Sequence, residues 1–286
     1  MIVGQDSLKR NRILILTLRV HSLAGGALKS FLKLSFLLTF FSFSAHSQDL
    51  SMYHKKEFSS TAGTKLPYRI LFPENYDQTK KYPLILVLHG AGERGGDNEK
   101  QLVHGSKLFL DSVVRREYPA IVVFPQCPEE SYWSSVTIDR EKLPLALDFN
   151  YAQPITSPLN DAISLIESLK ETEGVNEKRI YITGLSMGGM GTFEAVHRFP
   201  DMFASALPIC GGGDTVGYKK VKTPFWVFHG TDDAVVDVEY SRAMVDKLKD
   251  LKVKVKYTEY PGVNHNSWDN AFAEPDFLKW MFKNKK

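Results

Sequence analysis

The chain has 286 residues, of which 43% are hydrophobic, 24% charged and 12% aromatic, a composition that excludes disordered, fibrous and disulfide-stapled proteins. The formal net charge is +3, but residues 1–47 contain six basic residues and one acid, so residues 48–286 carry a net charge of −2. The basic balance therefore belongs to the N-terminal segment, and the rest of the chain has no electrostatic footprint for binding a nucleic acid.

The N-terminal segment has the pattern of a secretory signal peptide. Lys29 and Lys33 precede an apolar run over residues 34–43, and the small residues Ala45 and Ser47 follow it. A membrane anchor is the alternative interpretation, but this run is too short to cross a hydrocarbon core, which needs roughly 20 residues. We therefore expect cleavage near Ser47 and an exported, periplasmic or extracellular protein without stable membrane insertion.

The predicted signal peptide is long, and the sequence does not decide where its translation starts. Residues 1–28 precede Lys29, Lys33 and the apolar run, and no further Met occurs before Met52. An extended basic region and translation from a non-Met codon near Leu28 both fit. In either case we expect residues 1–47 to be the signal peptide and residues 48–286 to form one catalytic domain.

Short apolar runs alternate with amphipathic segments along the remaining chain. The runs expected to form strands are 66–72, 82–90, 120–126, 179–184, 204–210, 225–230 and 253–260. Helical periodicity is present over residues 159–169 and 240–251, and residues 192–198 have helical character. This alternation predicts an α/β fold, with a mostly parallel central sheet and helices on both faces. Ligands of such sheets bind beyond the carboxyl ends of the strands.

The two cysteines are expected to be unpaired. Cys127 and Cys210 each follow a predicted strand, and two other strands are expected between these two. At about 4.8 Å per step the thiols would be roughly 14 Å apart, which is beyond disulfide reach. This geometry outweighs the oxidising compartment, which would otherwise permit a bridge.

A candidate nucleophile follows the strand at 179–184. Residues 184–189 read GLSMGG, a GxSxG motif between a strand and a helix. The flanking positions are glycines because a Cβ there would collide with the neighbouring strand or helix. The context therefore favours Ser186 as a nucleophile over an ordinary turn serine.

A serine hydroxyl needs a base within hydrogen-bond reach and a third group that orients the base. Asp232 and Asp233 follow the strand at 225–230, and His265 follows the last strand. The order Ser186, Asp233, His265 is the Ser, Asp, His order of α/β-hydrolases. We therefore expect a Ser-His-Asp triad of Ser186, His265 and Asp233.

Residues 48–286 as a whole resemble an α/β-hydrolase. More narrowly, they resemble the bacterial carboxylesterases grouped with polyhydroxybutyrate depolymerases, feruloyl esterases and "predicted peptidases". The segments that carry the resemblance are LHGAGERGGDN at 88–98, FPQCP at 124–128, GLSMGG at 184–189, HGTDDAVV at 229–236 and HNSW at 265–268. In this group the acid usually stands four residues after the histidine of the HGxxD pattern, which is Asp233 here, with Asp232 as the alternative.

The resemblance also implies an oxyanion hole. The loop at 89–92 matches the segment that donates one backbone amide in this fold, and the residue after the nucleophile donates the other. These donors would be the N–H groups of Ala91 and Met187, which would stabilise the charge on the carbonyl oxygen. Residues 211–224 are too short for a cap domain, so we expect no large cap and an open active site.

Other residues have two interpretations. His89 and His229 are expected to be structural, because a triad needs only one histidine. Glu93 and Arg94 either pair with each other or face the substrate. The long segment at 128–158, with its aromatic residues, is either a wall of the pocket or a surface flap.

The sequence therefore predicts a secreted serine hydrolase that cleaves carboxylic esters through an acyl-enzyme. The substrate would be a small-molecule or polymer-borne ester. No cofactor is expected, and no metal, because none of the eight histidines has an HExxH-like spacing. One alternative is a serine peptidase of the prolyl-oligopeptidase type, which the lack of a propeller domain disfavours. The other is a non-catalytic binding module, which would be expected to lack a triad residue.

Overall fold

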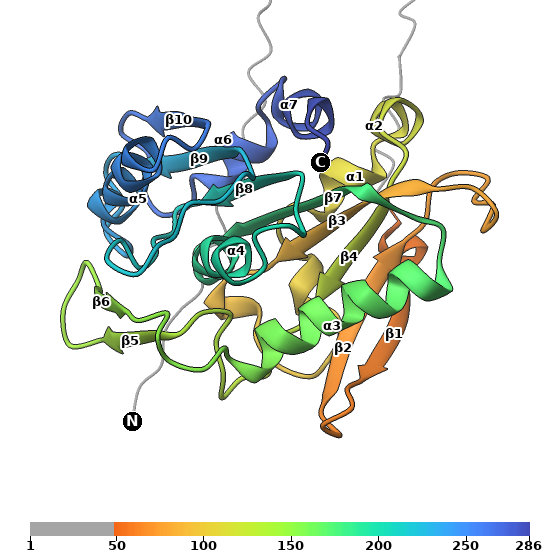
Figure 1. The fold of residues 1–286 in the computed structure, drawn as a ribbon, viewed down its shortest axis with the longest axis horizontal. Helices are drawn as coiled ribbons and strands as arrows, with labels where there is room; N and C mark the ends of the chain where they lie inside the picture. The colour runs from red at the N-terminus through yellow and green to blue at the C-terminus, as the bar shows by residue number, and fades with distance from the viewer. Residues whose placement is uncertain (1–48) are drawn as a thin grey trace, which may run out of the picture. The chain divides into compact units, whose positions relative to one another are not determined.

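A computed structural model describes residues 49–286 of the chain. Its centre is an eight-stranded sheet with the strand order β1-β2-β4-β3-β7-β8-β9-β10 (Figure 1). The strands are β1 (His54–Ser59), β2 (Lys65–Leu71), β3 (Tyr82–Leu88), β4 (Ile121–Pro125), β7 (Val175–Leu185), β8 (Ser205–Ile209), β9 (Phe225–Gly230) and β10 (Val255–Tyr260). The pairs β1–β2 and β2–β4 are antiparallel, and the other pairs are parallel. The predicted α/β class with a mostly parallel sheet is confirmed.

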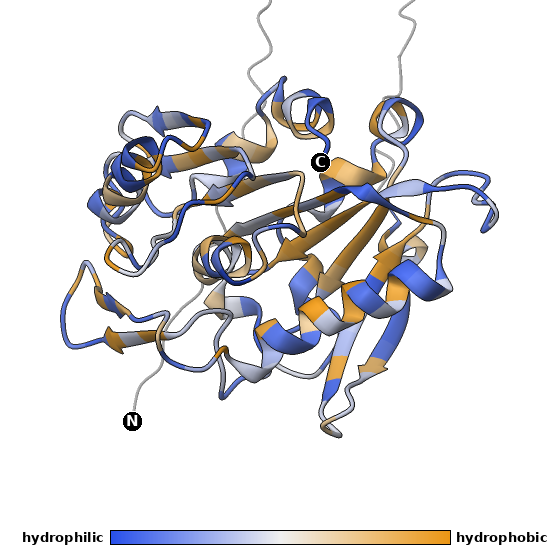
Figure 2. Cartoon of the chain, in the orientation of Figure 1, coloured by the Kyte–Doolittle hydropathy of each residue, from blue (hydrophilic) through white to orange (hydrophobic). Residues whose placement is uncertain are grey.

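Helices cover both faces of this sheet. They are α1 (Ser106–Leu110), α2 (Ser112–Glu117), α3 (Ser157–Thr172), α4 (Met187–Arg198), α5 (Val238–Asp250), α6 (Trp268–Phe272) and α7 (Phe277–Lys283). Successive residues of β3 enter different core clusters. Leu84 and Leu86 pack in the cluster that includes residues of α3, α4 and α5, while Ile85 and Val87 pack with residues of α1, α6 and α7. The central strands β3 and β4 are apolar along nearly their whole length (Figure 2), because both of their faces meet a helical layer.

Two strand pairings were not expected from the sequence. β1 is an antiparallel edge strand whose residues HKKEFS are mostly exposed, so it has no apolar run to reveal it. β5 (Val136–Asp139) and β6 (Ala146–Phe149) form an antiparallel hairpin within the long segment at 128–158. This hairpin is a separate two-stranded sheet, and it supplies part of the cavity described below.

Cys127 and Cys210 are unpaired, as expected, and both are buried. β3 and β7 lie between the strands that precede Cys127 and Cys210. Burial raises the pKa of the Cys127 thiol to about 12 and raises that of Cys210 further. Both groups are therefore protonated and unreactive near neutral pH.

The predicted signal peptide at residues 1–47 lies outside the described residues. In the part of the chain that the structure describes, no helix combines the length and the apolar character needed to cross a membrane.

Candidate active site

The turn between β7 and α4 holds Ser186 in an uncommon backbone conformation. Its φ is 52° and its ψ is −117°, values that a non-glycine residue adopts only at a cost of roughly 1–3 kcal/mol. The turn is tight enough that a Cβ on Gly184 would lie 2.4 Å from the Gly188 carbonyl oxygen. A Cβ on Gly188 would lie 2.0 Å from the Leu88 carbonyl oxygen. The glycines of the motif are therefore required by close backbone approach, as the sequence indicated.

This crowding gives a prediction for stability. Gly188→Ala should lower the free energy of unfolding by about 3 kcal/mol, because the new methyl group meets backbone atoms that cannot move aside. Gly96→Ala is the matched control, since its Cβ would meet nothing within 4 Å. Urea denaturation of the two variants measures the difference, and equal stabilities would contradict the packing of the turn.

Three side chains from separate strand ends meet at the carboxyl edge of the sheet. Ser186 follows β7, Asp233 follows β9 and His265 follows β10. The distance from Ser186 Oγ to His265 Nε2 is 2.9 Å, and the distance from His265 Nδ1 to Asp233 Oδ2 is 2.8 Å. The alternative acid, Asp232, is exposed and accepts a hydrogen bond from Thr231 Oγ1. The structure thus brings together the three residues that the sequence singled out and places Asp233 against His265.

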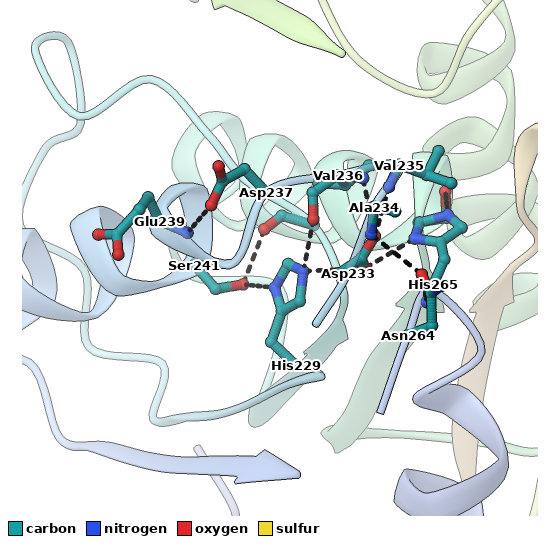
Figure 3. A network of polar contacts seen from close by, with 12 residues as sticks. His229, Asp233, Ala234, Val235, Val236, Asp237, Glu239, Ser241, Asn264 and His265 are labelled. Atoms are coloured by element: carbon teal, nitrogen blue, oxygen red, sulfur yellow. Dashed lines mark hydrogen bonds and ion pairs between the residues drawn. The ribbon is translucent and has the colours of Figure 1, made fainter. Parts of the chain in front are cut away.

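The carboxylate of Asp233 is buried and fully supplied with donors. The backbone N–H groups of Val235 and Val236 each donate to Oδ1 over 2.9 Å. On the other side, Oδ2 faces His265 Nδ1 and His229 Nε2 (Figure 3). Burial raises the pKa of Asp233, but these hydrogen bonds from His229, His265 and Val235 outweigh it and hold the pKa well below its ordinary value.

The low pKa of Asp233 predicts how stability depends on pH. A carboxyl whose pKa is lowered by folding stabilises the fold above its ordinary value of 3.8, and this contribution is lost as pH falls through the lower folded-state value. The difference in free energy of unfolding between the wild type and Asp233→Asn should be constant from about pH 7 to 5 and shrink below about pH 4. Urea titrations across this range measure it. A difference that does not change would mean that the carboxylate is not held ionised.

The expected oxyanion donors lie next to the nucleophile. Met187 is the first residue of α4, and Ala91 is the first residue of the 3-10 helix η2 (Ala91–Glu93). An N–H group in the first turn of a helix has no carbonyl partner within that helix, so both groups are available to a ligand. Ala91 and Ser186 also line the same cavity.

Two side chains brace the loop that carries Ala91. His89 is buried; its Nε2 accepts from the Cys127 N–H over 2.9 Å, and its Nδ1 lies 2.6 Å from the Gly90 carbonyl oxygen. Burial lowers the pKa of His89 to about 4, so the ring is neutral and donates from Nδ1. Arg94 donates to the carbonyl oxygen of Ala91 and, from Nη1, to that of Glu129 over 2.6 Å. Both residues have structural contacts, as the sequence indicated for His89.

The cavity at Ser186 has a volume of about 310 Å³. Its walls are mostly apolar and come from the oxyanion loop, the turn at Ser186 and the β5–β6 hairpin; they include Tyr132, Ile138, Leu145, Leu185, Met190, Val235 and Trp268. Part of the segment at 128–158 is therefore a wall of the pocket. Of its aromatic residues only Tyr132 lines the cavity; Trp133 is buried, and Phe149 packs on Tyr240.

Glu93 faces this cavity and does not pair with Arg94. Its Oε1 lies 3.7 Å from His104 Nε2, while its Oε2 is buried without a hydrogen-bond partner. The Oε2 atom would be 3.0 Å from a Cβ on Gly90, so the carboxylate lies beside the oxyanion loop. The two residues therefore have different positions: Arg94 braces the loop, and Glu93 lines the cavity where a substrate would bind.

One group of side chains has the composition of a metal site. Potential ligand atoms of Cys210, Asp233 and His265 lie within 4.8 Å of one another. Two of these residues are hydrogen-bonded to each other, and the raised pKa of the buried Cys210 thiol keeps it protonated. Hydrogen bonding therefore accounts for the cluster, and its residues do not fit a metal ion.

Several proteins that are similar to this chain are hydrolases by name. A sequence model of the Dienelactone hydrolase family matches residues 138–276, which include Ser186, Asp233 and His265. The structure of a thermostable esterase is 39% identical, with a TM-score of 0.74 over 82% of this chain, which spans 64% of that esterase chain. Carboxylesterase SOBER1 of Arabidopsis thaliana is 27% identical over 204 residues, 64% of this chain and 82% of that protein.

A further structure, a ferulic acid esterase from Anaeromyces mucronatus, is 17% identical, with a TM-score of 0.60 over 80% of this chain and 90% of that one. At this identity the likeness concerns the fold. By sheet topology and strand-end geometry, the chain has the α/β-hydrolase fold. It is a carboxylic ester hydrolase, similar to carboxylesterases and, over residues 138–276, to the Dienelactone hydrolase family.

Proposed function

We propose that the chain is an exported serine carboxylesterase that works through Ser186, His265 and Asp233. The observation that carries the proposal is the continuous hydrogen-bonded chain from Ser186 Oγ through both ring nitrogens of His265 to Asp233 Oδ2. Such a chain lets the histidine remove the serine proton while the acid holds the ring in the required tautomer. A non-catalytic binding module would not need this hydrogen-bonded chain of serine, histidine and carboxylate.

The reaction proceeds through an acyl-enzyme. Ser186 Oγ attacks the ester carbonyl carbon, its proton moves to His265 Nε2, and the N–H groups of Ala91 and Met187 bind the oxyanion. The carbon–oxygen bond to the alcohol then breaks, and the alcohol leaves with the proton from His265. Water, deprotonated by His265, attacks the acyl-enzyme and releases the acid and the free Ser186.

The cavities favour a short or flat acyl group on a polar alcohol. At about 310 Å³, the apolar cavity at Ser186 is near the lower end of the range for small-molecule sites. It shares Tyr132, Ile138 and Arg140 with a neighbouring hollow of about 650 Å³ that has many polar side chains in its walls. We place the acyl group in the first and the alcohol portion, free or polymer-borne, toward the second.

Export rests on the sequence of the first 47 residues. The basic, apolar and small-residue order would direct the chain to the periplasm or the medium, where residues 48–286 would act as a single catalytic domain.

Fluorophosphonate labelling of residues 48–286 tests this proposal. The reagent reacts only where a nucleophilic serine and an oxyanion hole are both assembled, and mass spectrometry locates the modified peptide. We expect labelling at Ser186 and hydrolysis of acetate, butyrate and ferulate esters above that of long-chain esters. No labelling of the folded protein would overturn the mechanism, and faster cleavage of peptide amides than of esters would favour the peptidase.

A further inference from the structure

His229 lies behind the acid of the proposed triad and has no assigned role. It occupies the next-to-last position of β9 and is completely buried. Its Nε2 lies 3.1 Å from Asp233 Oδ2 and 2.9 Å from the Val236 carbonyl oxygen. Its Nδ1 lies 2.7 Å from Ser241 Oγ (Figure 3). Ser241 Oγ in turn lies 2.8 Å from the Gly211 carbonyl oxygen.

The hydrogen on the ring can be assigned from these contacts. A carbonyl oxygen and an ionised carboxylate oxygen both accept hydrogen bonds, and neither can donate. A ring nitrogen without hydrogen would therefore point its lone pair at two oxygen atoms in a buried site. Nε2 of His229 must carry hydrogen, which it shares between Asp233 Oδ2 and the Val236 carbonyl oxygen.

The two oxygens of Asp233 are held differently. Oδ1 is held by two backbone N–H groups, from Val235 and Val236. Oδ2 has only side-chain donors, and one of them, His265, is the ring that exchanges a proton with Ser186 in the proposed reaction. His229 is the donor to Oδ2 that takes no part in this exchange, because it is buried in the sheet.

We propose that His229 is a positioning residue that holds Asp233 Oδ2 in place for His265 throughout the reaction. The inference rests on the proposed function, because it gives His229 a role in that reaction beyond the stability of the loop. Ser241, on α5, hydrogen-bonds to the Nδ1 side of the ring and also to the Gly211 carbonyl oxygen in the loop after β8. The charged groups around His229 are Asp233, its β10 neighbour Glu259 and Arg242, which is bound to Glu259.

Two amide substitutions separate this role from simple packing. Glutamine places its side-chain amide near the Nε2 position and can still donate to Asp233. Asparagine, one carbon shorter, reaches only the Nδ1 position and loses that donor. We expect His229→Asn to lower kcat by roughly 10- to 100-fold with KM nearly unchanged, by analogy with the loss of a partner that orients a metal ligand. His229→Gln should restore kcat to within severalfold of the wild type.

The controls distinguish the possible failures. Labelling at Ser186 and ester turnover by the wild type test the proposed function alone. With an active wild type, equal kcat losses in the two variants, or wild-type kcat in His229→Asn, would overturn the positioning role. Nitrogen NMR of His229 in the wild-type protein needs no variant to fold: we expect a protonated Nε2, and an unprotonated Nε2 would also overturn it.

Discussion

Ser186→Ala should reduce ester hydrolysis by roughly 10⁵- to 10⁶-fold in kcat, an effect as large as any expected of a single substitution in this chain. The variant loses the Oγ atom that attacks the carbonyl carbon in the proposed reaction. A small rate above the uncatalysed reaction should remain, because the N–H groups of Ala91 and Met187 still face the cavity. The measurement is steady-state turnover of a butyrate ester.

The substitution should leave the fold intact. Ser186 is in an uncommon backbone conformation, and alanine meets the same backbone cost as serine. Ser164→Ala, at a half-buried position of α3 where the hydroxyl bonds only the Asn160 carbonyl oxygen, is the matched control and should keep full activity. Turnover by a folded, pure Ser186→Ala variant would rule out this serine as the nucleophile.

Much of this site could be predicted because its residues stand at strand ends. The apolar runs locate β7, β9 and β10, and parallel strands bring their carboxyl ends to one edge. Once that edge is known, Ser186, Asp233 and His265 must come close, whatever the details of the loops. The same reasoning correctly separated Cys127 from Cys210, since it depends only on the strand order.

The remainder of the site depends on contacts that have no local pattern. The β5–β6 hairpin has only four residues in each strand, mostly half exposed, so no apolar period marks it. Its position over the cavity depends on distant partners, such as the Leu145 N–H that donates to the Val235 carbonyl oxygen. The contacts of His229 with Asp233 and Ser241 likewise arise from a tight turn and a helix start that sequence alone does not place. A histidine in an HGxxD pattern therefore looked only structural.

His229 and His265 both face Oδ2 of Asp233. These contacts determine which way the amide of an Asp233→Asn variant is oriented and which ring nitrogen of His265 carries hydrogen. In Asp233→Asn the amide oxygen stays at the Oδ1 position, because the N–H groups of Val235 and Val236 need an acceptor there. The NH₂ group then occupies the Oδ2 position and faces the ring nitrogens of both histidines. His265 can accept from it only if its hydrogen moves from Nδ1 to Nε2, and this tautomer cannot take the proton of Ser186.

We therefore expect Asp233→Asn to lower kcat by about 10⁴-fold at neutral pH with little change in KM, because the tautomer is wrong while the cavity is unchanged. Asp232→Asn makes the same chemical change one residue away, on an exposed side chain that bonds only Thr231, and should keep nearly full activity. Steady-state kinetics of both variants measures the contrast. If Asp232→Asn caused the larger loss, the acid of the triad would be Asp232, and the hydrogen bond from His265 to Asp233 would not be the one that operates in the reaction.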